Sequence, residues 1–223
     1  MIQLSNVTKT FGSPKKQVNA LKNIKLDIAR GEFIVIKGPS GSGKTTLLLT
    51  IGTMLQPSSG NVLIENRNIF TLNEHQRRKF RATNIGFVFQ EFFLIPYLNA
   101  FENIILSAGL ENDVTTHSKA LKLLNDIGLT DRMLHKPSEL SAGEQQRVGL
   151  ARALIHDPKI ILADEPTGNL DKENAEIIIH LLGNYHKSGG TVVMCTHRDD
   201  ADNYADRILN LRRGEITDHV GSH

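Results

Sequence analysis

The sequence contains one cysteine, no long apolar run and little net charge, and each shortage excludes a class of protein. Cys195 has no partner for an internal disulfide, its apolar neighbours predict a small buried side chain, and its isolation fits a reducing compartment. No stretch approaches the roughly 20 apolar residues of a membrane-spanning helix. Residues 1–6 lack the basic and apolar regions of a signal peptide. We therefore expect a cytoplasmic protein, and any role at a membrane must come through a partner.

The charge balance gives no support for a nucleic-acid partner. The chain carries 26 Lys and Arg against 24 Asp and Glu, a formal net charge of +2, so it offers no broad basic footprint. Its 223 residues, of which 39% are hydrophobic, are enough to bury a core without disulfides. We expect an ordinary globular chain of one or two domains that does not bind nucleic acid.

The order of secondary-structure signals predicts an α/β protein. Apolar runs and helical patterns alternate along most of the chain, which implies a mainly parallel sheet covered by helices. Between residues 91 and 156 the strand signals vanish and helical patterns replace them, so a helical insertion is predicted there. The expected strands are 2–7, 20–28, 32–37, 62–64, 85–89, 160–163, 191–196 and 208–211, and the expected helices are 44–55, 100–108, 118–127, 142–155 and 172–185.

The segment after the third expected strand matches the phosphate-loop pattern G-x-x-x-x-G-K-[ST]. Glycines let the backbone fold so that N–H groups point at phosphate oxygens, and the following helix aims its positive end at the same anion. Lys44 can reach the β- and γ-phosphates, and the Thr45 hydroxyl can ligate Mg²⁺. The alternative, a chance glycine turn, is expected in about 1% of chains of this length. The predicted nucleotide-binding residues are Gly38, Pro39, Ser40, Gly41, Ser42, Gly43, Lys44, Thr45 and Thr46.

Two adjacent acids end the apolar run at residues 159–163. Asp164, at the end of a buried strand, can hold Mg²⁺ directly or through water. Glu165, one residue further, can polarise an attacking water as a general base. An isolated Asp-Glu pair would more often be a strand leaving the core for solvent, but the accompanying phosphate loop favours the functional interpretation.

The residues between these motifs carry a family resemblance. The run Leu140-Ser-Ala-Gly-Glu-Gln-Gln-Arg-Val148 resembles the Leu-Ser-Gly-Gly-Gln signature of ABC-transporter nucleotide-binding subunits. The order of motifs along essentially the whole chain also matches that family: phosphate loop, Gln90, signature, acidic strand, the Asp-containing loop 169–171, and His197.

The resemblance implies an α/β P-loop NTPase fold with a mainly parallel core sheet, an antiparallel β subdomain and a helical subdomain. All of these would belong to one domain, residues 1–223. Its core and antiparallel part would come from 1–90 and 157–223, and its helical part from 91–156.

The same resemblance implies a head-to-tail dimer of two copies that encloses two ATP molecules with Mg²⁺. Ser141 and Gly143 of one copy would contact the γ-phosphate held by Lys44 of the other copy, because a hydroxyl and a backbone N–H at a helix N-terminus suit an anion. Hydrolysis would then depend on dimerisation. Without the family, Ser141 would be a plain helix N-cap, and the two roles are compatible.

Four further residues take their roles only through the resemblance. Phe11 would stack on adenine, where the family often has tyrosine, and the alternative is a core phenylalanine. Gln90 would contact Mg²⁺ and the attacking water. His197 would contact the γ-phosphate and orient water and Glu165, although a lone histidine is usually structural. Asp171 would help the two copies communicate across their interface.

Two signature positions depart from the family pattern. Ala142 replaces the first glycine, and its methyl group restricts the backbone near the phosphate. Glu144 replaces the terminal glutamine and puts a negative charge near the interface. Ser141 and Gly143, the expected contacts, remain, so we expect ATP hydrolysis to survive both changes.

Several segments resemble one bacterial branch of the family, the ATPases of lipoprotein release, macrolide and peptide export, and the cell-division complex. These segments are 87–90, 93–96, 100–103 and 163–171. Such ATPases work at the inner face of the cell membrane with integral permease subunits. An apolar surface for that partner, with some members packed inside the helical insertion, is expected from Phe92, Phe93, Leu94, Ile95 and Tyr97.

Two other functions stay open from sequence. A soluble ABC ATPase acting on DNA or ribosomes would usually carry a long coiled-coil insertion or two cassettes in one chain, and neither is present. A division-complex module, in which hydrolysis is a signal, is not separated from a transport ATPase. The basic segment 77–81 is predicted to be helical, with a solvated face rather than a lipid-binding one.

Overall fold

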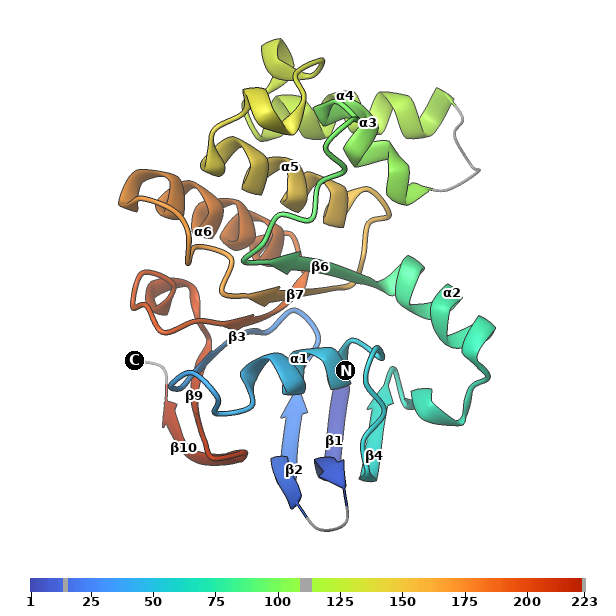
Figure 1. Cartoon of the computed structure of the whole chain (residues 1–223), viewed down its shortest axis with the longest axis vertical. Helices are drawn as coiled ribbons and strands as arrows, with labels where there is room; N and C mark the ends of the chain where they lie inside the picture. The colour runs from blue at the N-terminus through green and yellow to red at the C-terminus, as the bar shows by residue number, and fades with distance from the viewer. Residues whose placement is uncertain (14–15, 109–113, 222–223) are drawn as a thin grey trace.

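The computed structural model describes residues 1–13, 16–108 and 114–221, which form two β-sheets and covering helices (Figure 1). The strands are β1 (Ile2–Ser13), β2 (Lys16–Ile28), β3 (Phe33–Lys37), β4 (Ser59–Ile64), β5 (Arg67–Asn68), β6 (Ile85–Phe89), β7 (Ile160–Asp164), β8 (Thr191–Cys195), β9 (Arg207–Arg212) and β10 (Glu215–Gly221). The α-helices are α1 (Lys44–Ile51), α2 (Glu74–Asn84), α3 (Ala100–Ile105), α4 (Val114–Asp126), α5 (Ala142–Leu154) and α6 (Lys172–Lys187). None of the helices in these ranges has the length and apolar character that a bilayer crossing requires.

The larger sheet gathers the ends of its parallel strands along one edge. Its order is β10-β9-β3-β8-β7-β6, with β10 antiparallel to β9 and the other neighbours parallel. Asp164 is in register with Phe89 on one side and with Cys195 on the other, and Cys195 is in register with Ile36. The residues that follow these strands therefore emerge side by side, where ligands of open α/β sheets bind.

Both faces of this sheet are covered, which explains its uninterrupted apolar strands. One face packs with α1 and the antiparallel sheet β2-β1-β4-β5 and contributes Ile34, Ile36, Leu162, Val193 and Cys195. The other face packs with α6 and contributes Phe33, Val35, Ile161, Ala163 and Met194. Because successive strand residues point to opposite faces, a sheet buried on both sides needs apolar residues at every position.

A third hydrophobic cluster holds the helical subdomain together. It is built from α3, α4, α5 and the turns between them, with Ile104, Leu124 and Val148 among its fully buried members. In Figure 1 these helices form a layer beyond α6 and β6. Within this layer α5 lies nearest to the rest of the protein, because it also packs against β6 and α6.

The α/β fold predicted from sequence is confirmed, and its local differences have physical causes. Strand β1 runs to Ser13 instead of ending near residue 7, because its second half pairs with β2 in an exposed hairpin, with Phe11 opposite Val18. Helix α1 ends at Ile51 rather than 55, because Thr53 adopts a left-handed backbone with φ of 63°, which a right-handed helix cannot continue through.

Three elements carry too little apolar pattern to be found in full from sequence. Strands β5 and β10 were not expected, and the helix anticipated around 77–81 extends over the whole of α2. No residue of α2 is buried, and Phe80 and Ala82 are its only apolar residues, too few to mark a helix in the sequence. Its start is fixed instead by a capping box between Asn73 and Gln76.

Candidate functional site

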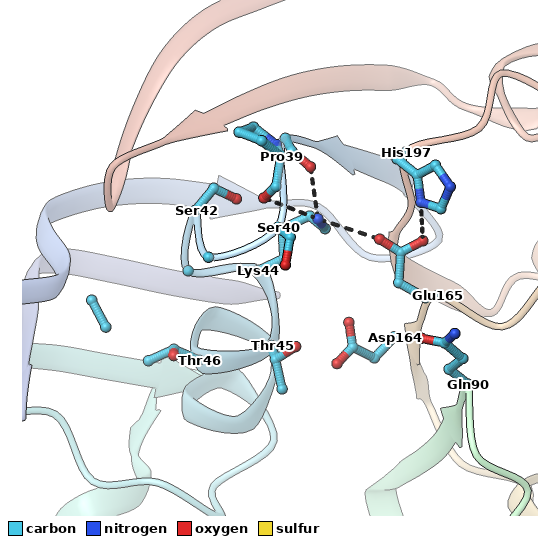
Figure 2. Close-up of a pocket in the computed structure, with 14 residues that line it drawn as sticks. Pro39, Ser40, Ser42, Lys44, Thr45, Thr46, Gln90, Asp164, Glu165 and His197 are labelled. Atoms are coloured by element: carbon cyan, nitrogen blue, oxygen red, sulfur yellow. Dashed lines mark hydrogen bonds and ion pairs between the residues drawn. The ribbon is translucent and has the colours of Figure 1, made fainter. Parts of the chain in front are cut away.

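A cavity of about 700 Å³ lies at the carboxyl edge of the parallel sheet (Figure 2). It is lined by Ala20, Gly38, Pro39, Ser40, Gly41, Ser42, Gly43, Lys44, Thr45, Thr46, Gln90, Asp164, Glu165 and His197. Stretches far apart in the sequence meet here because β3, β6, β7 and β8 end at one edge. Of the predicted nucleotide-site residues, those outside the lining are Phe11, Ser141, Gly143 and Asp171.

Close backbone packing requires glycine at two positions of the phosphate loop. Gly43 is the N-cap of α1 with φ of 109°, and a Cβ there would lie 2.4 Å from the Ala20 carbonyl oxygen. A Cβ on Gly38 would lie 2.2 Å from a backbone oxygen of β9. The Gly214 N–H donates to the Ser42 carbonyl at 2.9 Å. Sequence reasoning missed Ala20, because its contribution here is a backbone contact that no side-chain motif marks.

The inner side of the loop offers polar groups that suit an anion. Ser42 Oγ is buried and has no hydrogen-bond partner among the described residues. The first N–H groups of α1 lack partners within the helix and form the positive end of its dipole. The Lys44 side chain is largely buried, and its Nζ donates to the Gly38 carbonyl at 2.7 Å. This set of donors fits a polyphosphate.

Glu165 connects the phosphate loop to the segment after β8 (Figure 2). Its Oε1 lies 3.3 Å from Lys44 Nζ, and its Oε2 lies 2.9 Å from His197 Nδ1. The Glu165 backbone has φ of 48°, in the left-handed region that a non-glycine residue rarely adopts, and its N–H donates to the Cys195 carbonyl at 2.8 Å. Such strain persists where surrounding contacts enforce it and clusters at functional sites.

Asp164 presents an unpaired carboxylate oxygen beside Thr45. Burial raises the pKa of Asp164 and the Glu165 charge adds to the rise, whereas a hydrogen bond with Thr45 and the Lys44 ammonium oppose it. The Asp164 Oδ1 atom is buried and unpartnered among the described residues. A carboxylate and a hydroxyl are oxygen donors that suit Mg²⁺, which completes its shell with water and substrate phosphates. No group of three or more His, Cys, Asp or Glu within the described ranges could hold a metal.

Gln90 is paired with the Asp-containing loop. Its Nε2 donates to Asn169 Oδ1 at 2.9 Å, and Asn169 Nδ2 donates to the Gln90 carbonyl at 3.4 Å. A Cβ on the adjacent Gly168 would lie 3.0 Å from Gln90 Nε2. Sequence reasoning placed Gln90 in the site but missed this contact, because Asn169 follows 79 residues later.

Phe11 lies outside the cavity lining, in the exposed half of β1. Its side chain is 43% exposed, and Lys9 Nζ lies 5.2 Å from the ring centroid. The alternative of a core phenylalanine is therefore wrong. Adenine stacking by Phe11 stays a prediction carried by the family resemblance.

Ser141 is the N-cap of α5, as its sequence position predicts. Its Oγ accepts from the Glu144 N–H at 3.3 Å, and Glu144 Oε2 accepts from the Ser141 N–H at 2.7 Å, which makes a capping box. This backbone N–H, more than the Ser141 hydroxyl or Arg132, holds the pKa of Glu144 below its ordinary value. The departure from glutamine at Glu144 therefore places a negative charge at the positive end of α5.

Gly143 is required by the neighbouring helix of the same chain. It is buried, and a Cβ there would lie 2.0 Å from Asn174 Oδ1. That oxygen accepts from Arg147 Nη1 at 3.1 Å, while the Asn174 N–H donates to Asp171, the N-cap of α6, at 2.8 Å. Gly143 and Asp171 thus belong to one packed contact between the starts of α5 and α6. Sequence reasoning missed Asn174 and Arg147, whose meeting depends on the fold.

Sequence comparison places this arrangement among ATP-binding proteins of transporters. Residues 21–168 match the family model described as ABC transporter. The chain is 44% identical over 222 residues to the uncharacterized ABC transporter ATP-binding protein MJ1508 of Methanocaldococcus jannaschii, covering 99% of both chains. It is 41% identical to the macrolide export ATP-binding/permease protein MacB of Bdellovibrio bacteriovorus, covering 97% of this chain and 33% of MacB. The chain therefore spans about a third of that relative.

Solved structures share the fold. A dimeric post-hydrolysis state of the ATP-binding cassette MJ0796, also from Methanocaldococcus jannaschii, has ADP and Pi bound. This chain matches it with a TM-score of 0.92 at 42% identity, covering 99% of this chain and 98% of that one. A second dimeric MJ0796 structure matches with a TM-score of 0.91 at 43% identity, over 99% and 98% of the two chains.

We predict that Gly143→Ala destabilises the isolated chain, because the new methyl group overlaps Asn174. Overpacking of this kind costs about 1–3 kcal/mol, against about 1 kcal/mol gained by replacing a helical glycine. In an Asn174→Gly background the Oδ1, Cγ and Cβ atoms that the new methyl group meets are all gone, and the same change should be neutral or stabilising. Urea unfolding of the wild type, both single variants and the double variant measures this coupling. Equal destabilisation in both backgrounds would show that Asn174 does not impose the glycine.

Proposed function

The chain belongs to the ABC transporter family, and on that premise we propose that it binds and hydrolyses ATP as the motor subunit of a membrane complex. The observation that carries this function is the convergence of Lys44, Asp164 and Glu165 on the phosphate loop. One side of the cavity offers cationic and N–H donors for a polyphosphate, and the other offers carboxylates for Mg²⁺ and water. The ADP and Pi bound to MJ0796 support ATP as the nucleotide.

Nucleotide binding uses the loop and its surroundings. The N–H groups at the start of α1 and the Lys44 ammonium bind the β- and γ-phosphates. The Thr45 hydroxyl, the Asp164 carboxylate and the Gln90 amide oxygen would hold Mg²⁺, which neutralises phosphate charge when bound. Phe11 stacks on adenine from the exposed β1–β2 hairpin.

Hydrolysis uses the strained carboxylate at the end of β7. Glu165 accepts a proton from a water whose oxygen attacks the γ-phosphorus, while the bond to the β-phosphate oxygen breaks and leaves ADP and phosphate. His197, 2.9 Å from Glu165 Oε2, keeps that carboxylate oriented and contacts the γ-phosphate.

The active unit is a head-to-tail dimer, because the cavity of one copy takes no lining residue from α5. Ser141 is exposed at the start of that helix, and Gly143 belongs to its first turn, whose N–H groups lack helical partners. Placed against a second copy, this helix end supplies a hydroxyl and an N–H to the γ-phosphate. Asp171 lies beside it at the start of α6. The dimeric MJ0796 structures support this assembly.

A groove next to Gln90 is the proposed contact with integral membrane permease subunits. It has a volume of about 250 Å³ and is lined by Ala82, Ile85, Gly86, Phe87, Phe89, Ser107, Arg152, Ala153 and His156. At its rim Phe93 is 63% exposed and packs edge-on against Phe89, with ring centroids 5.4 Å apart. The Arg152 guanidinium donates to the backbone carbonyls of Phe92 and Phe93 and so fixes this rim.

The aromatic segment 92–97 divides between core and surface, as its sequence predicts. Leu94 packs into the helical core, whereas Phe93 and Tyr97 are exposed. An exposed apolar rim beside a groove suits a short helix from a membrane subunit. MacB, which is named as a macrolide export ATP-binding/permease protein, supports this class of partner and a role in export. Lipoprotein extraction and transmission of mechanical force are the other roles that we propose for the complex. The chain then lies on the inner face of the membrane through that partner.

We predict that Glu165→Gln keeps ATP binding and lowers the hydrolysis rate by about 10²–10⁴-fold, because an amide cannot accept the proton. Unhydrolysed ATP should hold two copies together, so this variant should elute as a dimer in size-exclusion chromatography with ATP. Glu176→Gln, at an exposed position of α6, is the matched control and should behave as the wild type. Near-normal turnover by Glu165→Gln would remove Glu165 from its role.

A mixed dimer tests whether each site is shared between copies. Lys44→Ala and Ser141→Arg should each abolish hydrolysis alone, because both sites of either homodimer lose one half. Mixing the two variants should restore part of the activity, since one site of the mixed dimer joins an intact Lys44 to an intact Ser141. The control is a chain carrying both changes mixed with the wild type, whose mixed dimer has no intact site. Failure of the first mixture to recover activity would contradict the shared site.

Substitution at the groove rim tests the membrane partner. We predict that Phe93→Asp lowers recovery of the membrane subunit that co-purifies with the wild-type chain from its native membrane, because a charge replaces an apolar contact. Mass spectrometry identifies that subunit. Leu134→Asp, which changes a 69% exposed leucine outside the groove lining, is the control. Undiminished recovery with Phe93→Asp, or a recovered partner that is ribosomal, would contradict this surface.

A further inference from the structure

Gln146 is a buried polar side chain of α5 that the proposed site does not use. It is 1% exposed, although its buried neighbours on the helix, Val148 and Leu150, are apolar. The Gln146 Nε2 atom donates to the Phe89 carbonyl at 2.9 Å and to the Pro166 carbonyl at 2.7 Å. Both hydrogens of one amide nitrogen are therefore used, and they reach the last residue of β6 and the turn that follows β7.

The two accepting carbonyls adjoin the residues proposed to handle water. Phe89 directly precedes Gln90, and Pro166 directly follows Glu165. The pairing of β6 with β7 ends at Phe89, so Gln90 and Glu165 lie just beyond the ladder that aligns the two strands. The Gln146 amide therefore links the end of β6 to the segment after β7, at the point where the hydrogen bonds between the two strands end.

We propose that Gln146 is a positioning residue for hydrolysis, whose amide sets Gln90 against Glu165 in its own chain by holding the Phe89 and Pro166 carbonyls. This role rests on the proposed ATPase function. Buried backbone carbonyls require donors, and here one side chain supplies both. Because Glu165 has a left-handed backbone, the chain on each side of it must be held for the carboxylate to keep its place.

Three substitutions separate this role from simple packing. Gln146→Leu keeps a similar volume but removes both donors, leaving two buried carbonyls unpaired. Gln146→Glu keeps the shape, and burial raises the pKa of the introduced carboxyl, whose protonated form regains one O–H donor. Gln76→Leu is the control, because it makes the same side-chain change at an exposed position of α2, which contributes no residue to the cavity lining.

The first measurement is the hydrolysis rate and the ATP dissociation constant of each full-length variant. Gln146→Leu should lower kcat by about tenfold or more while ATP affinity changes by less than about threefold. The rate of Gln146→Glu relative to the wild type should rise as the pH falls from about 8 to about 6, because protonation restores a donor. Gln76→Leu should keep both constants near the wild-type values.

The second measurement places Gln146→Leu in one chain of the mixed dimer. The intact site there takes Lys44, Gln90 and Glu165 from the chain that carries Ser141→Arg. Gln146→Leu in that chain should lower the rate, whereas in the Lys44→Ala chain it should lower it much less. The reverse pattern would mean that Gln146 shapes the signature for the partner, and would overturn the positioning role.

Each remaining outcome is also decisive. Hydrolysis by the wild type together with an unaffected Gln146→Leu variant would overturn the positioning role alone, whereas absence of wild-type hydrolysis would overturn the proposed function with it. A parallel loss of ATP affinity and kcat, without recovery of Gln146→Glu at lower pH, would show that Gln146 only fills the core. If Gln146→Leu does not fold, the pH profile of Gln146→Glu decides the question.

Discussion

The register of the parallel strands is the constraint on which the rest of the structure depends. Phe89, Asp164 and Cys195 lie side by side in β6, β7 and β8, so the residues after them converge without any local sequence relation. A shift of one residue in β7 would turn Asp164 to the opposite face of the sheet. Such a shift is opposed by the packing of β7, because Ile160 and Leu162 belong to one core and Ile161 and Ala163 to the other. The packing of the sheet therefore determines the geometry of the site.

The starts of α5 and α6 must satisfy two structural requirements, one within a single chain and one in the proposed dimer. Within one chain, Gly143 must lack a side chain because Asn174 occupies that space, and Asn174 is held by Asp171 and Arg147. In the proposed dimer the same helix ends face the partner's nucleotide. A residue type required in both settings cannot be assigned to one of them by sequence alone. The stability of the isolated chain separates the two requirements, because a single copy contains the contact with Asn174 but not the contact with a partner's nucleotide.

What the sequence revealed depended on how local each signal was. The phosphate loop and the pair Asp164–Glu165 could be predicted because the groups that would act together are a few residues that are adjacent in the sequence. The contacts of Asn169 and Asn174 could not, since each depends on a partner brought close by the fold. Ala20 contributes backbone contact, which no side-chain pattern marks. The outer half of β1 and helix α2 were found only in part because these exposed segments contain few apolar residues.

The position of Lys44 couples nucleotide binding to the proposed base. Its ammonium lies 2.7 Å from the Gly38 carbonyl and 3.3 Å from Glu165 Oε1, so it already holds a carboxylate as its anionic partner. A γ-phosphate bound at the start of α1 carries more charge than a carboxylate and competes for that ammonium. In the proposed site, a turn of Lys44 toward the phosphate would leave Glu165 Oε1 without this ion pair, while Oε2 would keep its contact with His197. Substrate binding would thereby free one oxygen of the proposed base to face the attacking water.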